Sequence, residues 1–556
     1  MAILLPLTLL VPLLGLALVG RSPARARETA LAVSLLVLAM AGWLLVHFPV
    51  DGKAFAAVDW PWLTWPGSPL DIRLSLGLDG LGVWLFGLSA LLMVVSVLIS
   101  WEAIQDQPQK YYRLLLLLEF GLLGVFSARD IILFYVFFEF TLIPLFFLIG
   151  IWGSEERQYA AVKFFLFTLA GSVLTFLGLL AIVLLHYYRW PADGITFSIP
   201  RLTALLAVRP LDPHVQLWIF LALFAGFAIK VPLFPLHTWL PLAHVQAPTA
   251  GSVILAGLLL KIGVYGFLRF SLPMLPDAAV ACMPWLLWLS VIGIIYGALV
   301  ALAQPDMKRL IAYSSVSHLG FCMLGIFALN RLGIGGGALQ MINHGLSTGG
   351  LFAVVGMLYE RYHTRQIADL GGLAKRTPLL AFFMLVLTLS SIGLPGLNGF
   401  VGEFLLLLGM FQRAWAGPIT SATAQLRCIS VLAVAGVVLG AWYMLHLVQR
   451  VFFGPLREPN HRHEESPVRD LCLREVLALA PLVVFIVWIG VQPRPFLDRM
   501  APALEPLCAV TAQAIERAEF GMGNSEFGIN SEVGSIEKRR VSPAASMQVC
   551  PLFHNP

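Results

Sequence analysis

Seven ionisable side chains lie inside apolar stretches that are long enough to cross a lipid bilayer. They are Glu119, Glu139, Lys230, Lys261, His318, His344 and Glu403. A charged group in the hydrocarbon core is costly unless it is paired or hydrated, so such residues usually mark an ion or proton path. Carboxylates, amines and imidazoles are also the side chains that bind and release protons. The set therefore predicts a proton path inside the membrane.

Glu139 and Lys230 are predicted to form a switchable pair on that path. Burial disfavours the charged form of a lysine, whereas a nearby carboxylate favours it. Contact between the two side chains would hold a proton, and separation would release it. Pro144, one turn beyond Glu139, leaves a helix carbonyl unpaired that water could occupy. The alternative is a static ion pair that only fixes helix packing.

Lys261, His318 and His344 are predicted to form the middle of the path. Lys261 has no carboxylate in its own span, so we expect it to be neutral for part of a cycle. Its alternative is a lysine that extends to the membrane surface. The two histidines lie on adjacent spans and can relay protons through either ring nitrogen near neutral pH. Their alternatives are packing residues, or a two-histidine metal site without an evident third ligand.

Glu403 is predicted to be the terminal proton carrier, because Gly399 and Gly402 just before it leave room for water. Glu119 is an accessory candidate that either packs against another subunit or assists Glu139. His237, between the prolines of the same stretch as Lys230, is a second accessory candidate.

Other kinds of site are not expected. The glycines within residues 333–337 begin a membrane span, so they do not form a dinucleotide-binding turn. The His and Glu residues within 461–465 could ligate a metal, but a solvated loop is the preferred interpretation. Six cysteines lie far apart, which excludes an iron–sulfur, zinc or disulfide framework by spacing.

The elements that must position these residues are transmembrane helices. Of 556 residues, 59% are hydrophobic and 12% are charged, whereas soluble domains have about 25% charged residues. The sequence predicts an all-α polytopic membrane protein in the lipid bilayer with about fourteen spans. The net charge of +5 comes without a basic stripe, so nucleic acid is not an expected partner.

Two spans, at about 215–241 and 380–411, are interrupted by Gly and Pro, and each holds a buried charge. Paired interruptions of this kind indicate a duplicated transporter unit. We expect N-terminal helices and an extracytoplasmic loop at 1–77, a first repeat at 78–281 and a second at 282–452. A cytoplasmic loop and last helix should follow at 453–500, and a disordered polar tail at 501–556.

Orientation follows from the loops, where Lys and Arg are more numerous on one side. That side is predicted to be cytoplasmic, and an even number of spans then places both termini outside. The basic cluster at residues 21–27 follows the first apolar run instead of preceding it, so a retained first helix is expected.

Three stretches resemble the antiporter-like membrane subunits of proton-pumping NADH:quinone oxidoreductase, respiratory complex I. They are KVPLFPLHTWLPLAHVQAPTAGSVILAGLLLKIGVYG, QPDMKRLIAYSSVSHLGF and PGLNGFVGEF. The resemblance covers about residues 75–490. It implies fourteen helices with two inverted five-helix repeats and broken helices 7 and 12. It also implies the proton-path roles given above, with Glu139 and Lys230 as the switchable pair and Glu403 at the outlet. Between them lie Lys261, His318 and His344.

The resemblance further implies a membrane-arm subunit of a translocase in the plasma membrane of a prokaryote. NADH, FMN, iron–sulfur clusters and quinone are then expected in partner subunits, with no cofactor in this chain. Other antiporter-like chains are the expected neighbours. Chains L and N of that complex typically have a lysine at the position of Glu403. The glutamate therefore favours the remaining antiporter-like chain of the complex. The alternative is a subunit of a multisubunit cation/proton antiporter or of a membrane-bound hydrogenase with the same fold.

Overall fold

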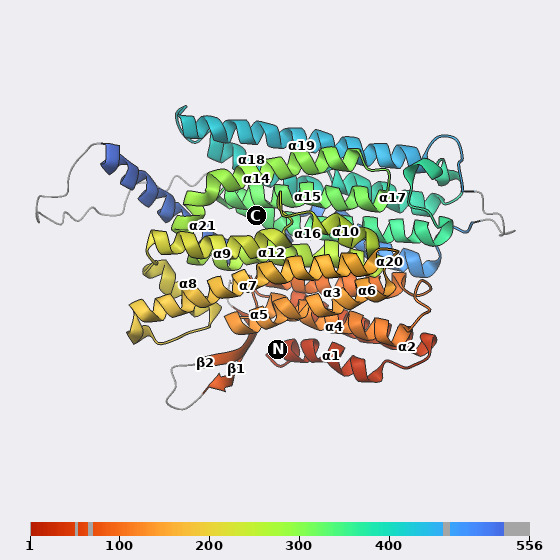
Figure 1. Ribbon diagram of the computed structural model, residues 1–556, viewed down its shortest axis with the longest axis horizontal. Coiled ribbons are helices and arrows are strands. Elements are labelled where there is room, and N and C mark those ends of the chain that lie inside the picture. The colour runs from red at the N-terminus through yellow and green to blue at the C-terminus, as the bar shows by residue number, and fades with distance from the viewer. Residues whose placement is uncertain (1, 51–53, 65–70, 460–467, 527–556) are drawn as a thin grey trace, which may run out of the picture. The chain divides into compact units, whose positions relative to one another are not determined.

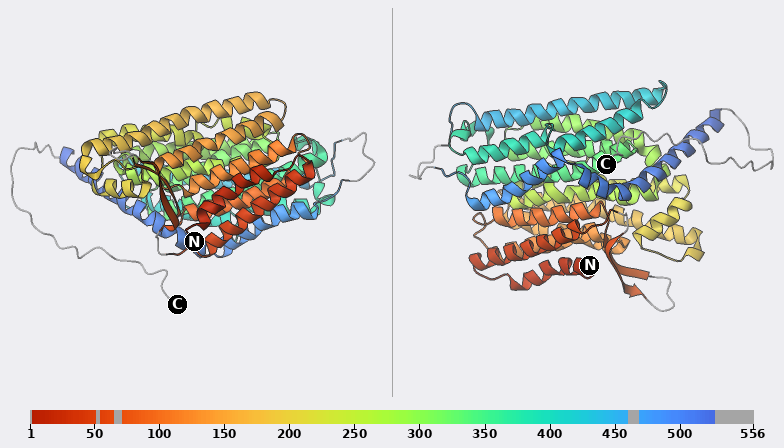
Figure 2. Two further views of the ribbon diagram at one scale, coloured as in Figure 1. Left: turned by 90° about the horizontal axis from the view of Figure 1, so that it is seen from below. Right: turned by 180° about the vertical axis from the view of Figure 1, so that it is seen from behind.

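The computed structural model describes residues 2–50, 54–64, 71–459 and 468–526. Eleven of the helices in these ranges are long and apolar enough to cross a bilayer. The chain is a multi-pass membrane protein, as its composition predicts. Residues 1–515 form one unit and residues 516–556 a second. In the first unit the long helices lie side by side along one common direction (Figures 1 and 2).

The N-terminal part consists of two helices and a hairpin. Helix α1 spans Leu4–Leu18 and α2 spans Pro23–Val46, and the antiparallel strands β1 and β2 span Phe55–Thr64 and Asp71–Leu78. Helix α3, Gly82–Ile99, follows the hairpin directly and is buried along almost its whole length.

The first half of the bundle continues with long helices and short helical pieces. They are α4 (Pro108–Ser127), α5 (Ile131–Phe140), α6 (Leu142–Trp152), α7 (Arg157–Arg189), α8 (Ile199–Val208), α9 (Pro213–Lys230), α10 (Trp239–Gln246), α11 (Thr249–Ile254), α12 (Leu260–Gly266) and α13 (Leu272–Met274). The last three form one continuous span, because π-helical turns at Leu255–Leu259 and Phe267–Ser271 join them.

The second half has longer helices. They are α14 (Pro276–Leu302), α15 (Met307–Phe327), α16 (Arg331–Tyr362), α17 (Pro378–Ser391), α18 (Asn398–Ala414), α19 (Ser421–Phe452), α20 (Leu473–Val491) and α21 (Arg494–Glu526). Helix α16 lies at the centre of the bundle and packs against α3, α11, α15 and α18. Glycines on α16 allow this close approach, so the glycine-rich stretch at 333–337 is a packing surface.

Both predicted helix breaks are present. Between α9 and α10 the prolines stop the helix, and the indole of Trp239 donates to the carbonyl of Ile229 at 3.0 Å. Between α17 and α18 the chain turns through Gly393 and Gly396, whose φ angles of +73° and +93° favour glycine. Buried carbonyls need partners, and side chains near each break supply some of them. The count of fourteen spans and the inverted repeat remain predictions.

The tail predicted to be disordered from residue 501 is helical as far as Glu526, so that prediction was wrong for its described part. Phe496, Met500, Leu504 and Leu507 are buried on one face of α21, and Phe496 stacks on Trp84 of α3 at 4.2 Å. The buried residues recur every three to four positions, but two prolines and many polar residues within α21 make this helical pattern hard to recognise in the sequence. Residues 527–556 and the loop at 461–465 lie outside the described residues.

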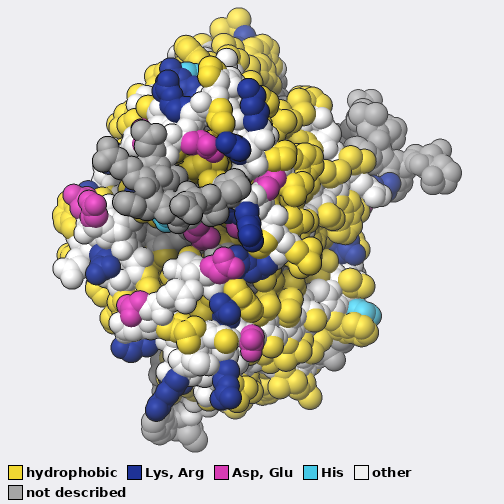
Figure 3. All heavy atoms as spheres, turned by 90° about the vertical axis from the view of Figure 1, so that its right-hand side faces the viewer, with side chains coloured by type: hydrophobic (Ala, Val, Ile, Leu, Met, Phe, Trp, Pro, Cys, Tyr) yellow, Lys and Arg dark blue, Asp and Glu magenta, His cyan; other side chains and the backbone are white. Residues whose placement is uncertain are grey.

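One end of the helices carries many charged side chains, while the flanks are mostly hydrophobic (Figure 3). On the flanks, α7 exposes Leu166 and Leu177, and α19 exposes Val438 and Trp442. Large apolar side chains on outward faces suit a lipid environment better than water. These faces therefore border the bilayer or a neighbouring membrane subunit.

Candidate proton path

Four predicted residues meet in the centre of the bundle, although they come from four different helices. Lys261 Nζ of α12 lies 2.5 Å from His344 Nδ1 of α16. The ring of His344 lies 5.6 Å, centroid to centroid, from the ring of His318 on α15. His318 Nδ1 lies 3.4 Å from Glu403 Oε1 on α18. All four are at most 5% exposed. We call this row the central chain.

Lys261 is held by the π-helical turn that precedes it. Its ammonium also donates to the carbonyl of Ala256, in that turn, at 2.5 Å. Single π-helical turns within α-helices often occur at functional sites. The lysine thus has two acceptors, one from its own span and one from His344.

His318 is oriented by partners on both ring nitrogens. Nε2 lies 3.1 Å from Ser391 Oγ and 3.4 Å from Tyr443 Oη, while Nδ1 faces Glu403. A neutral ring that donates from Nδ1 and accepts at Nε2 fits this arrangement. An imidazolium would donate from both nitrogens, so the site accommodates either form of the ring.

An amide network fixes Glu403. Gln340 Nε2 donates to Glu403 Oε1 at 3.0 Å. Asn343 donates to Gln340 Oε1 at 3.1 Å and to the carbonyl of Asn398, where α18 begins, at 2.8 Å. Gly402 makes room for these amides, because a Cβ there would collide with Gln340 Oε1. Sequence reasoning missed Gln340, Asn343 and Ser391, although polar residues inside apolar spans were the available signal.

Glu139 and Lys230 are apart in this structure. Glu139 accepts hydrogen bonds from Tyr135 at 3.2 Å and from Ser172. Lys230 Nζ lies 4.5 Å from the centre of the Phe138 ring and has no hydrogen-bond partner in the described chain. No ion pair joins these two residues within the described ranges, so the switchable pair stays a prediction.

Lys230 is nevertheless close to the central chain through the packing of α9 on α12. A Cβ at Gly263 would lie 2.7 Å from the carbonyl oxygen of Phe227 and 2.9 Å from Lys230 Cβ. Gly263 is only two residues after Lys261, so the end of α9 lies directly against the lysine-bearing turn of α12.

The two accessory candidates lie away from the central chain. Glu119 is fully buried on α4 and accepts one hydrogen bond, at 3.3 Å, from Ser34 of α2. His237 lies in the break after α9, where its ring is 5.2 Å from that of Tyr296 on α14. Neither makes a hydrogen bond or ion pair with the four residues of the central chain.

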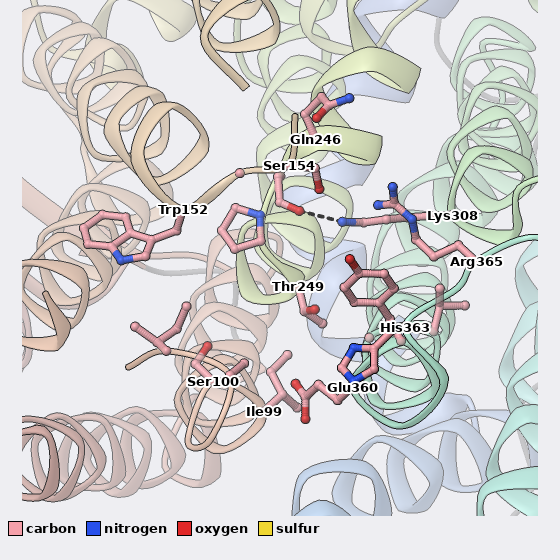
Figure 4. Close-up of a pocket in the computed structure, with 18 of the residues that line it drawn as sticks. Ile99, Ser100, Trp152, Ser154, Gln246, Thr249, Lys308, Glu360, His363 and Arg365 are labelled. Carbon is pink, nitrogen blue, oxygen red and sulfur yellow. Dashed lines mark hydrogen bonds between the residues drawn. The ribbon is translucent and has the colours of Figure 1, made fainter. Parts of the chain in front are cut away.

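A cavity of about 760 Å³ opens where α3 and α6 end and α11 begins (Figure 4). Its lining includes Lys308, Glu360 and Arg365, which are polar groups near a membrane surface. Lys308 Nζ donates to the carbonyl of Ala247 at 2.5 Å. Water can therefore approach a buried lysine from this side.

His244 is a residue that sequence reasoning missed as a site residue. It is fully buried on α10, and its ring stacks on Phe352 of α16 at 4.4 Å. Neither ring nitrogen has a partner in the described chain. Phe352 is eight residues after His344, or roughly 12 Å along α16, and Gly356 one turn further lines the cavity. His244 thus lies between the cavity and the central chain.

A metal would fit the central chain poorly. Among the described residues no three His, Cys, Asp or Glu side chains are grouped as metal ligands. His344 Nδ1 is occupied by the Lys261 amine, and His318 Nδ1 by the Glu403 carboxylate. The two rings therefore use these nitrogens for proton-bearing partners.

Comparison with known proteins places this arrangement in a family. The family model described as NADH:quinone oxidoreductase/Mrp antiporter, TM matches residues 128–427, which include every residue of the central chain. NADH-quinone oxidoreductase subunit M of Rhodobacter capsulatus is 42% identical over 497 residues, which cover 88% of this chain and 92% of the relative. The chain belongs to the subunit M family of NADH-quinone oxidoreductase. The resemblance inferred from the three motifs is thereby confirmed.

Solved structures agree with membership of the subunit M family. A chain of respiratory complex I from Thermus thermophilus with bound NADH has a TM-score of 0.79 and 33% identity, covering 91% of this chain and 99% of that one. A chain of the Mrp complex from Dietzia sp. DQ12-45-1b has a TM-score of 0.72 at 22% identity, covering 97% of this chain and 57% of that one. The second likeness shows the shared fold alone.

Proposed function

We propose that this chain translocates protons as a membrane-arm subunit of an NADH:quinone oxidoreductase. The observation that carries the proposal is the central chain, in which an amine, two imidazoles and a carboxylate follow one another inside a membrane protein. Every member can gain and lose a proton. Membership of the subunit M family supplies the complex, an NADH-quinone oxidoreductase.

The path begins at the cavity of Figure 4 and passes Lys308 and His244 to reach Lys261. The Lys261 ammonium then donates to His344 Nδ1 across the 2.5 Å contact. A ring rotation or an intervening water carries the proton from His344 to His318. His318 passes it from Nδ1 to the Glu403 carboxylate, which releases it beyond the α17–α18 break.

Glu139 and Lys230 control the entry of charge. When their helices approach, the carboxylate stabilises the ammonium of Lys230, and a charge there disfavours a second one on nearby Lys261. When they separate further, the carboxylate stabilises the Lys230 ammonium less, and Lys261 is then free to accept a proton. The two arrangements would therefore alternate during turnover.

Electron transfer belongs to other subunits in this proposal. NADH, FMN, iron–sulfur clusters and quinone are bound by partners, and this chain contributes to a translocase without a redox centre of its own. Its neighbours are the other antiporter-like chains of the membrane arm. The complex lies in the plasma membrane of a prokaryote, with both termini of this chain on the extracytoplasmic side.

The test is Lys261→Met in the intact complex, assayed in sealed membrane vesicles. Methionine fills the space without carrying a proton, so most NADH-driven proton pumping should be lost while the complex still assembles. Lys163→Met is the matched control, because Lys163 lies on the outer helix α7 beside Tyr159, 5.9 Å from its ring centre. Normal pumping by the Lys261 variant would overturn the proposal.

A further inference from the structure

A second cavity, of about 400 Å³, lies at the opposite end of the helices from the one in Figure 4. The first cavity is lined by the end of α3 and the beginning of α11, whereas the second is lined by Leu81, before α3, and by Pro273, in α13. The central chain makes no use of it. Its floor holds charged side chains, and its walls are apolar.

One ion pair in this cavity is already complete. Arg269 Nη1 lies 2.5 Å from Asp79 Oδ2, and Arg269 Nε donates to Tyr265 Oη at 3.0 Å. Asp79 Oδ1 also accepts from the backbone N–H of Gly82 at 2.8 Å. Asp79 is the only carboxylate among the described residues that line the cavity, and Arg269 neutralises it.

Arg129 is a second cation in the same cavity. Among the described residues no carboxylate forms a salt bridge with it, and Asp79 and Asp59 attract it only from a greater distance. Its backbone is fixed on both sides, because its N–H donates to the carbonyl of Ser75 and its carbonyl accepts from the N–H of Ile199, each at 2.9 Å. Its side chain lies over Gly77, where a Cβ would come within 2.7 Å of Arg129 Cδ. The described part of the lining therefore holds two cations, Arg129 and Arg269, and one carboxylate, that of Asp79.

The walls explain what kind of anion would fit. On one side are Ile199, Ala204 and Ala207 of α8, and on the other Pro502 and Leu507 of α21. Thr203 adds a hydroxyl to the α8 wall. A guanidinium binds phosphate with two parallel hydrogen bonds, while small apolar side chains suit a hydrocarbon chain. Since this end of the helices meets the membrane surface, both chemistries are available in one kind of molecule.

We propose that this cavity binds the phosphate of an anionic phospholipid through Arg129, with an acyl chain lying between α8 and α21. The phosphate supplies a direct salt-bridge partner for Arg129, and the acyl chain fills the apolar slot. Bound in this way, the lipid would tie α21 to the first half of the bundle next to the β1–β2 hairpin.

The test measures retention of phosphatidylglycerol by the intact complex, washed in mild detergent and titrated with radiolabelled lipid. Arg129→Gln should lose one tightly held phosphatidylglycerol per complex, with an apparent affinity that is roughly tenfold or more weaker. Arg129→Lys should retain part of the affinity. Arg201→Gln is the matched control, since Arg201 is an arginine on α8, beside the cavity, but donates to the carbonyl of Asp193 outside it.

A second variant distinguishes specific lipid binding in this cavity from general attraction between anionic lipid and positive charge. Ala204→Trp leaves Arg129 in place but fills the slot, so it should also lose the tightly held lipid. Unchanged retention by both Arg129→Gln and Ala204→Trp would overturn the proposal. It would equally fail if inorganic phosphate competed fully with the lipid, which would indicate a free-anion site. If this subunit is lost from Arg129→Gln complexes while lipid retention is unchanged, the proposal is wrong, and Arg129 instead contacts a neighbouring subunit.

Discussion

Replacing Glu403 with glutamine tests the end of the central chain most directly. The side chain is 5% exposed and keeps its shape, so no cavity forms. Gln340 can still donate to the amide oxygen across the present 3.0 Å contact. What is lost is the negative charge 3.4 Å from His318 Nδ1 and the ability to accept a proton from it.

The size of the effect follows from that contact. A hydrogen bond to a charged group is worth about 2 kcal/mol, which corresponds to a roughly thirtyfold change in an equilibrium. Proton transfer from His318 Nδ1 to residue 403 should be disfavoured by at least that factor. If the proton flux passes through this step, a few per cent of the flux remains, and most NADH-driven pumping is lost.

The assay is quenching of a pH-sensitive dye by inverted membrane vesicles that oxidise NADH. Electron transfer from NADH to an artificial acceptor is measured in parallel, because it reports assembly without needing the membrane arm. Glu119→Gln is the matched control: Glu119 is equally buried, undergoes the same change, and lies between α2 and α4. Pumping above half of the unmodified level in Glu403→Gln would refute the reasoning, as would equal losses in both variants.

Two further predictions address the inlet and the pH dependence. His244→Phe keeps the stack on Phe352 but removes the imidazole, so we expect slower pumping at unchanged assembly. His237→Phe is its control, and equal rates in the two variants would exclude His244 from the inlet. Asp130 lies outside the membrane spans. Burial raises the pKa of its carboxyl group from 3.8 to about 6, although hydrogen bonds from the N–H groups of Leu133, Arg73 and Ile132 act to lower it. Because the pKa of Asp130 is higher in the folded than in the unfolded chain, its protonated carboxyl group stabilises the fold. This stabilisation is complete below about pH 3.8 and is lost as the pH rises through 6. Thermal stability should therefore fall by up to about 3 kcal/mol over that interval, whereas Asp130→Asn, which can still cap α5, should lack this dependence.

Much of the candidate site could be predicted from residue types alone. A lysine, a histidine or a glutamate in the middle of an apolar span is rare enough to indicate function by itself. Lys261, His318, His344 and Glu403 were identified in this way, and the structure brings all four together. The two helix breaks were equally visible, since Pro and Gly interrupt spans that are otherwise continuous.

The sequence did not reveal the partners that orient these groups. Gln340 and Asn343 look like ordinary polar residues on a glycine-rich helix until α18 is packed against α16. His244 was visible beside the prolines, but its position between a cavity and Lys261 depends on the stack with Phe352. The tail was misjudged because the buried face of α21 needs Trp84, some 400 residues earlier, as its packing partner.

By itself the sequence determined that this is a membrane protein with buried titratable groups and broken helices, because hydropathy and helix breaking are local properties. It also determined the family, through motifs that lie within single spans. Only the tertiary structure decided which of those groups touch. Lys261 and His344, or His318 and Glu403, are more than eighty residues apart in the chain and meet only through helix packing. Likewise, within the described ranges neither Lys230 nor Arg129 forms a salt bridge, and this depends on how the side chains pack, which residue order does not contain.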